Sequence, residues 1–224
     1  MRHQSTGTGH HWFLGLLRNP QGRPRGHVDR LDATLDNRLP HKDEHTSIHW
    51  HGIRLPNDQD GVPYLVQPPV EPGESFRYSF VPPDTGTFFF HTHCNTSEQL
   101  GRGLVGILIV DGDTTTPYAA DEVVLLRDWR IDLDGGTFSS FTTARGANRA
   151  GTYGNVRSAN GATQSEIALP ASADCRLRVI NADPTRIMDI AVDGADISLS
   201  GDEKGRGNWE FAGEPAPDAG PATD

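Results

Sequence analysis

Apolar and polar residues alternate along several short stretches of the chain, and turns rich in Pro and Gly separate these stretches. Residues 75–81 alternate strictly, with Phe76, Tyr78 and Phe80 on one face, which is typical of a half-buried strand. In the first half of the chain this pattern predicts strands at residues 28–37, 46–51, 75–81, 86–93 and 104–110. Short strands between turns predict an all-β sandwich or barrel.

The second half of the chain continues the β pattern with wider spacing. It predicts strands at residues 122–131, 164–169, 175–181 and 187–192. Residues 135–162, which are rich in Gly, Ser, Thr, Ala and Asn, are interpreted as a long loop. In the strand at 175–181, alternation places Cys175, Leu177 and Val179 on the inward face.

The two ends of the chain lack this pattern. Residues 1–26 carry Arg and His but no acid, show no clear period and are interpreted as an irregular leader without a signal-peptide pattern. Residues 201–224 are acidic and rich in Pro, which favours a disordered tail. The expected domains are therefore residues 27–114 and an incomplete second one at residues 118–200.

Composition and charge narrow the class of protein. Gly (25) and Pro (16) are more frequent than average, which favours a turn-rich β protein. A net charge of −10 without a run of Lys or Arg makes nucleic acid a poor partner. No apolar stretch is long enough to span a membrane. Two cysteines, Cys94 and Cys175, do not make a disulfide framework.

Candidate chemistry lies in four of the ten histidines. His49 and His51 form one pair, and His91 and His93 form another. Side chains at i and i+2 of a strand share a face, so each pair presents two imidazoles side by side. One such pair is more often a chance occurrence or a surface pair than a metal site, but two pairs favour a site for Cu, Zn or Ni. His41 and His45 flank a charged turn and are expected to be solvated.

The residues around the two histidine pairs resemble motifs of a known protein family. The stretches Thr46-Ser-Ile-His-Trp-His-Gly-Ile-Arg-Leu-Pro56 and Gly86-Thr-Phe-Phe-Phe-His-Thr-His93, with residues 99–110 after them, resemble the first cupredoxin (plastocyanin-like) domain of a multicopper oxidase. This is the group of laccases, copper-efflux oxidases and copper-resistance proteins. Residues 121–200 resemble the start of the family's second cupredoxin domain. The resemblance implies a Greek-key β-sandwich fold.

The resemblance also implies roles for individual residues. His49 would bind the type 2 copper, and His51, His91 and His93 would bind the type 3 copper pair. Asp60 matches an acid near the type 2 copper that helps to protonate reduced oxygen, and Glu98 is a further acid of interest. Trp50 and Thr92 fall on the opposite strand face and are expected to pack. In the complete enzyme, a small-molecule or metal-ion donor supplies single electrons through a type 1 copper, and dioxygen becomes water.

Part of the family pattern is missing. No histidine follows His93, so the later motifs that supply the type 1 site and four more cluster histidines are absent from this chain. Cys94 follows His93, but no downstream His or Met lies near, so Cys94 is interpreted as a core residue. We therefore expect an N-terminal piece of a multicopper oxidase, truncated or frame-shifted at both ends. The family is usually periplasmic or secreted, and the sequence leaves the compartment of this chain open.

Three functions remain open on the sequence. In the first alternative, the chain is an oxidoreductase fragment that carries half of a trinuclear copper site and needs a complementing cupredoxin domain. Alternatively, it is a copper-sequestering module, which binds copper without oxygen-dependent oxidation. As a third alternative, it is the inert product of a broken gene, whose exposed sheet edges favour aggregation.

Overall fold

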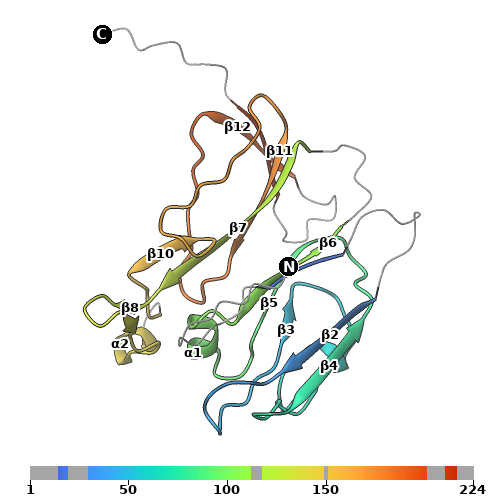
Figure 1. Ribbon diagram of the computed structural model, residues 1–224, viewed down its shortest axis with the longest axis vertical. Coiled ribbons are helices and arrows are strands. Elements are labelled where there is room, and N and C mark those ends of the chain that lie inside the picture. The colour runs from blue at the N-terminus through green and yellow to red at the C-terminus, as the bar shows by residue number, and fades with distance from the viewer. Residues whose placement is uncertain (1–14, 20–29, 112–117, 149–150, 201–209, 216–224) are drawn as a thin grey trace.

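The computed structural model of the protein describes residues 15–19, 30–111, 118–148, 151–200 and 210–215. These residues form two sets of strands, which lie one above the other in Figure 1. We call β1–β6 with helix α1 (Thr96–Gly101) the N-terminal unit, and β7–β13 with helix α2 (Ala144–Ala147) the C-terminal unit. The all-β expectation is confirmed, with short helices between strands. Within the described ranges, no helix is long and apolar enough to cross a membrane.

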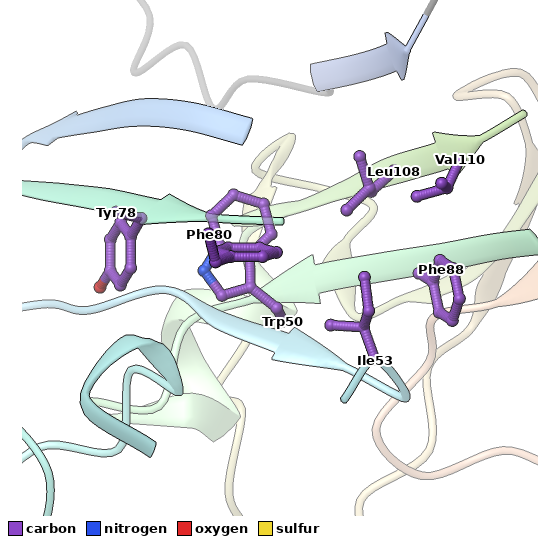
Figure 2. Close-up of a cluster of buried hydrophobic side chains, with 7 residues drawn as sticks. All are labelled: Trp50, Ile53, Tyr78, Phe80, Phe88, Leu108 and Val110. Carbon is purple, nitrogen blue, oxygen red and sulfur yellow. The ribbon is translucent and has the colours of Figure 1, made fainter. Parts of the chain in front are cut away.

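The N-terminal unit contains two sheets that enclose a core. One sheet has the strand order β1 (Gly15–Asn19), β6 (Val105–Val110), β5 (Gly86–His91) and β3 (His49–His51). The other pairs β2 (Leu31–Asp36) with β4 (Ser75–Phe80). Side chains from both sheets meet in the core shown in Figure 2, and its buried members are Trp50, Ile53, Tyr78, Phe80, Phe88, Leu108 and Val110. The predicted inward face of β4 is confirmed, because Tyr78 and Phe80 are buried.

The C-terminal unit is built on one five-stranded sheet. Its order is β10 (Val156–Ala159), β7 (Ala120–Trp129), β11 (Cys175–Asn181), β13 (Glu210–Pro215) and β12 (Ala195–Ser200). Strands β8 (Ile131–Asp132) and β9 (Thr137–Phe138) form a small second sheet. The two units share a second apolar cluster, in which Ile107 and Ile109 of β6 meet Leu125 of β7 and Ile180 of β11. Both faces of β6 are therefore buried, as its continuous apolar sequence predicts.

Both chain ends differ from the expectation where the structure describes them. Gly15–Asn19 of the expected leader form β1, which pairs in parallel with β6. Glu210–Pro215 of the expected tail form β13, which pairs with both β11 and β12. Pairing with distant strands stabilises these segments, and the local pattern does not reveal such partners. The other residues of 1–26 and 201–224 lie outside the described residues.

Three further predictions for the C-terminal unit are wrong. Residues 164–169 and 187–192 form no strand, and Ile187 is 92 % exposed. The strand in this region lies instead at β12, which has β13 as its partner. The expected loop at 135–162 contains β9, α2 and β10. Alternation alone does not make a strand where no neighbouring strand supplies hydrogen bonds.

The predicted inward face of β11 is also wrong for two of its three residues. Cys175 is buried, but Leu177 and Val179 are only half-buried, whereas Arg176 and Arg178 are buried. Both guanidinium groups donate hydrogen bonds to the Asp121 carboxylate of β7. Because this carboxylate pairs with both guanidinium groups, arginine can occupy positions that a polarity pattern assigns to solvent.

Candidate metal centre

Strands β3 and β5 place the two histidine pairs on one face of the sheet. They are antiparallel neighbours, and His49 lies directly opposite His91. The ring centroids of His49 and His51 are 5.7 Å apart, and those of His49 and His91 are 5.3 Å apart. His93 follows the end of β5, and its ring lies 5.0 Å from that of His49. The four predicted imidazoles therefore gather in one place.

Three of the four imidazoles come close enough to share an ion. Ligand atoms of His49, His51 and His91 all lie within 4.8 Å of one another. The closest approach joins His51 Nδ1 to His91 Nε2 at 3.3 Å. His93 lies beside this group and is not a member of it, although its ring stacks 5.9 Å from that of His91.

Burial favours the neutral form of three of the four imidazoles, those of His51, His91 and His93. It lowers the pKa of His91 to about 4. The pKa values of His51 and His93 are lowered as well, first by burial and then by the neighbouring His49 imidazole. Near neutral pH these three rings are therefore neutral, which is the form that binds a metal ion.

Two hydrogen bonds fix the ring orientations. His91 Nδ1 lies 2.9 Å from the carbonyl oxygen of Thr92, so an Nδ1–H donor leaves Nε2 free as a ligand. His49 Nδ1 lies 2.9 Å from the carbonyl oxygen of Asp60 and 3.2 Å from its carboxylate Oδ1. The same logic leaves Nε2 of His49 free. Asp60 thus lies beside the histidine with which the sequence associated it.

The loop that carries Asp60 reaches His49 because Gly61 has no side chain. Gly61 has φ +77°, and a Cβ there would lie 1.7 Å from the carbonyl oxygen of Ile48. At the other end of the loop, Gln59 accepts a hydrogen bond from the backbone N–H of Ser79. The start of β3 is held in turn by Tyr78, whose hydroxyl accepts a hydrogen bond from the Ile48 N–H at 2.9 Å.

The opposite faces of β3 and β5 point into the protein, as expected. Trp50 is 2 % exposed and packs against Tyr78 and Phe80. Thr92, between the two histidines of its motif, is 3 % exposed. Cys94 is also buried and lies near Ser47, which agrees with a core role.

Gln99 is a site-supporting residue to which the sequence analysis assigned no role. It lies on α1, is completely buried, and accepts hydrogen bonds through Oε1 from the hydroxyls of Thr46 and Thr92. Its Nε2 donates to the carbonyl oxygen of His45 at 3.0 Å. In the sequence, a glutamine directly before the apolar run that leads into β6 gives only weak evidence of this supporting role, because its hydrogen-bond partners come from distant parts of the chain.

The other candidate residues lie outside the histidine group. His41 is exposed, and His45 Nε2 lies 3.3 Å from the Tyr64 hydroxyl. Glu98 of α1 accepts hydrogen bonds from Arg102, which directly follows this helix, and this is a structural role. A cavity of about 420 Å³ separates these groups, and its lining is His41, Asp43, Glu44, His45, Asn95, Glu98 and Gln99.

Comparison with known proteins agrees with this geometry. Residues 27–115 match the family model described as multicopper oxidase. The chain is 41 % identical over 103 residues to Copper resistance protein A of Escherichia coli, which covers 45 % of this chain and 16 % of that protein. It is 36 % identical over 104 residues to Laccase-3 of Botryotinia fuckeliana, covering 45 % of this chain and 22 % of that protein.

A solved structure extends the similarity to both units. The multi-copper oxidase from Pseudomonas thermotolerans superimposes with a TM-score of 0.76 at 35 % identity, covering 92 % of this chain and 51 % of that chain. The present chain therefore spans about half the length of that oxidase, and less than a quarter of the two curated relatives.

Proposed function

Residues 27–115 of this chain belong to the multicopper oxidase family, and from this membership we propose that the chain binds copper through His49, His51, His91 and His93. In this proposal the four histidines form half of a trinuclear type 2/type 3 copper site in a laccase-like oxidoreductase. The carrying observation is the convergence of ligand atoms from His49, His51 and His91 within 4.8 Å.

The chemistry of the donor set supports copper. All four candidate ligands are imidazoles, which suit Cu, Zn and Ni, and burial favours the neutral form in three of them. Two nitrogens that bind one ion at about 2.0–2.1 Å each lie roughly 3 Å apart. The 3.3 Å between His51 Nδ1 and His91 Nε2 is compatible with this spacing, so we assign these two nitrogens to a shared ion.

In this proposal the four histidines have different tasks. His49, oriented by Asp60, is the type 2 ligand, and the other three histidines serve the type 3 pair. Bound copper would supply one-electron redox chemistry with dioxygen as the acceptor. Asp60, whose carboxylate is one-third exposed and within 3.2 Å of His49, would hold and deliver protons on the open side of the site.

The remaining ligands would come from elsewhere. His51 and His93 are exposed, so the histidine face is open to further ligands. No histidine follows His93, so a complementing cupredoxin domain would have to bring the other four cluster ligands and the type 1 site. A small-molecule or metal-ion donor and dioxygen are then the partners of the completed enzyme.

A second function is favoured by the same exposure. With His51 and His93 open to solvent, the chain can bind copper by itself and sequester or deliver it without oxidase activity. Copper binding together with a lack of oxygen-dependent oxidation of a phenolic donor would identify this function.

Copper loading of the purified chain tests the proposal. After copper loading and desalting, we expect about one or two copper ions per chain and no intense blue band, because type 1 ligands are missing. His49→Ala and His91→Ala should remove most of this copper, whereas the control His41→Ala should retain it. Equal retention in all variants would place the copper away from the histidines and contradict the proposal. No specific copper would also contradict it and would favour the inert product. An intense blue band would reveal a type 1 site and contradict the half-site assignment.

A further inference from the structure

A buried arginine of the C-terminal unit contacts the helix that supports the histidine site. Arg127 of β7 is 2 % exposed. Its Nη2 donates hydrogen bonds to the carbonyl oxygens of Leu100 and Gly101, at the end of α1. The last carbonyls of a helix lack internal partners and carry partial negative charge, so a cation there stabilises the helix end.

This contact is the principal polar compensation for the burial of Arg127. Among the described residues, its Nε and Nη1 have no hydrogen-bond partner. Its guanidinium also lies 4.7 Å from the ring centroid of Trp129. Burial lowers the pKa of Arg127 to about 10, which reflects the cost of this position. The charge of Asp183 opposes this lowering of the pKa, and the end of α1 supplies the direct hydrogen bonds to the guanidinium.

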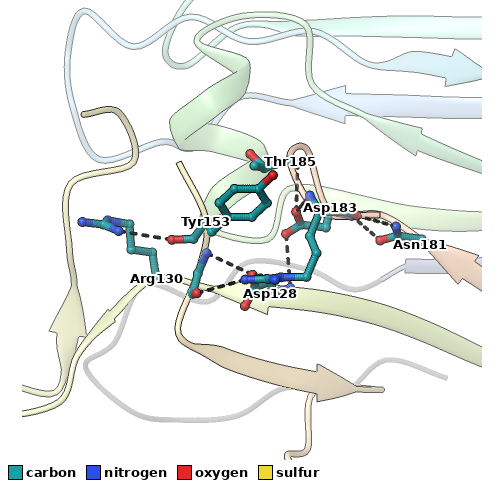
Figure 3. Close-up of polar contacts among 8 residues, drawn as sticks. Asp128, Arg130, Tyr153, Asn181, Asp183 and Thr185 are labelled. Carbon is teal, nitrogen blue, oxygen red and sulfur yellow. Dashed lines mark hydrogen bonds and ion pairs between the residues drawn. The ribbon is translucent and has the colours of Figure 1, made fainter. Parts of the chain in front are cut away.

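The segment next to Arg127 is fixed by its own polar network, shown in Figure 3. Arg186 donates a hydrogen bond to the Asp128 carboxylate, and so does the backbone N–H of Gly154. The Asp128 N–H donates to the Asp183 carboxylate at 3.2 Å. Arg127 is therefore presented to α1 from a rigid part of the C-terminal unit.

Phe141, a second residue of the C-terminal unit, contacts the same end of α1. A Cβ at Gly101 would lie 2.4 Å from the ring of Phe141, so helix and ring are in direct contact. The neighbouring Arg102 lies with its guanidinium carbon 5.1 Å from the centre of that ring. Arg127 and Phe141 together fix where α1 ends.

Through Gln99, helix α1 also contacts the segment that carries the candidate ligands His91 and His93. Gln99 precedes Leu100, and its Oε1 accepts a hydrogen bond from the Thr92 hydroxyl. Thr92 lies between His91 and His93, and its carbonyl oxygen is the partner of His91 Nδ1. Direct contacts thus join Arg127, α1, Gln99, Thr92 and the His91 imidazole, and His93 follows Thr92 in the chain.

We propose that Arg127 is a positioning residue for the histidine site: through α1 and Gln99 it sets the placement of His91 and His93, so that the metal site of the N-terminal unit depends on the C-terminal unit. The copper consequences rest on the proposed function, whereas the placement of the two imidazoles does not.

Imidazole resonances of the metal-free full chain test this placement by NMR. We expect Arg127→Leu to shift the His91 and His93 resonances clearly more than those of His49 and His51. Arg127→Lys, which keeps a donor and the charge, should shift them in the same direction and less. If Arg127→Leu does not fold, the lysine variant decides. Unchanged His91 and His93 resonances in a folded variant would overturn the proposal.

The matched control is Thr87→Val. It removes another polar contact between the units, from Arg178 to the Thr87 hydroxyl, without touching α1. We expect it to leave the His91 and His93 resonances in place. Shifts as large as those of the Arg127 variants would indicate general loosening of the interface and would overturn the specific route.

Copper titration tests the route through Gln99. Arg127→Lys and Gln99→Leu should each weaken copper binding roughly tenfold, as loss of a ligand-supporting contact does. The double variant should bind copper almost as tightly as Gln99→Leu alone. If the two losses of copper-binding free energy add, the route through Gln99 is overturned. If the unmodified chain binds no copper, the proposed function fails, and the NMR comparison still decides this inference.

Discussion

Burial lowers the pKa values of His51, His91 and His93 and so favours their uncharged form near neutral pH. For His91, burial lowers the pKa to about 4 against an ordinary 6.5, although its hydrogen bond to the Thr92 carbonyl favours the charged form. Because these three rings are neutral, they lie together without mutual charge repulsion.

A pH dependence of stability follows from this pKa. In the metal-free chain, the unfolded state takes up a proton at His91 near pH 6.5, whereas the folded state does so near pH 4. The free energy of unfolding should therefore fall as the pH drops from 6.5 to 4. Urea unfolding at pH 7 and pH 5 measures this loss, and His91→Gln should reduce it. Titration of His91 near 6.5 in the folded chain would contradict the expectation.

A second prediction concerns the loop at Asp60. Gly61→Ala should destabilise the chain by about 2–4 kcal/mol, because its Cβ would meet the Ile48 carbonyl and its φ is positive. It should also weaken copper binding, since the displaced loop releases His49. The control is Gly73→Ala, which has a similar φ of +85° but nothing within 4 Å of its Cβ, and should cost about 1 kcal/mol. Equal unfolding midpoints for the two variants would refute this.

Sequence periodicity alone predicted the positions of several individual residues of the histidine site. The i, i+2 spacing correctly placed His49 with His51, and Trp50 and Thr92 on the other face. Gln99 and the hydroxyl of Tyr78 could not be assigned, because their partners depend on how distant segments pack. Asp60 was placed through the family resemblance, since its position beside His49 depends on a backbone approach that only Gly61 permits.

At the scale of elements, strands with a strong local pattern were predicted well. Strands that are stabilised mainly by pairing with distant segments were not. The strand at 175–181 matches β11, and 75–81 matches β4 within one residue. Strands β1 and β13 were missed, since each exists by pairing with a strand far away in sequence. The buried arginines of β11 reversed its expected inward face, because polarity patterns do not reveal a carboxylate on the neighbouring strand.

That arrangement in β11 predicts a strong mutational effect. Burial alone would raise the pKa of the Asp121 carboxyl, but hydrogen bonds from Arg178 and Arg176 outweigh burial and hold that pKa well below its usual range. Asp121→Ala would leave two buried cations without this partner and should cost about 3–5 kcal/mol in the free energy of unfolding.

Chemical denaturation measures this cost against a matched exposed pair. Asp32→Ala, which breaks an exposed ion pair with Arg77 at 2.8 Å, should lower the free energy of unfolding far less than Asp121→Ala does. Similar costs for the two variants would show that Arg176 and Arg178 find other compensation.

At the scale of the whole molecule, the histidine site lies on the last strand of its sheet. The strand that carries His49 and His51 is the last in the order β1-β6-β5-β3. The chain spans about half the length of the Pseudomonas thermotolerans oxidase. The histidine face is open at His51 and His93, which are exposed. Further along β5 and β6 the same face carries Phe89 and Ile107, which pack in the cluster shared by both units, whereas the opposite face packs in the core of the N-terminal unit.

X-ray absorption spectroscopy of the copper-loaded chain tests the central claim most directly, because it identifies the atoms bound to copper. We expect imidazole nitrogen neighbours at about 2.0–2.1 Å and no sulfur neighbour. His51→Ala together with His91→Ala should abolish this signature. A sulfur neighbour would place a cysteine such as Cys94 at the copper, and a shell without imidazole would place copper away from the four histidines; either result would contradict the assignment.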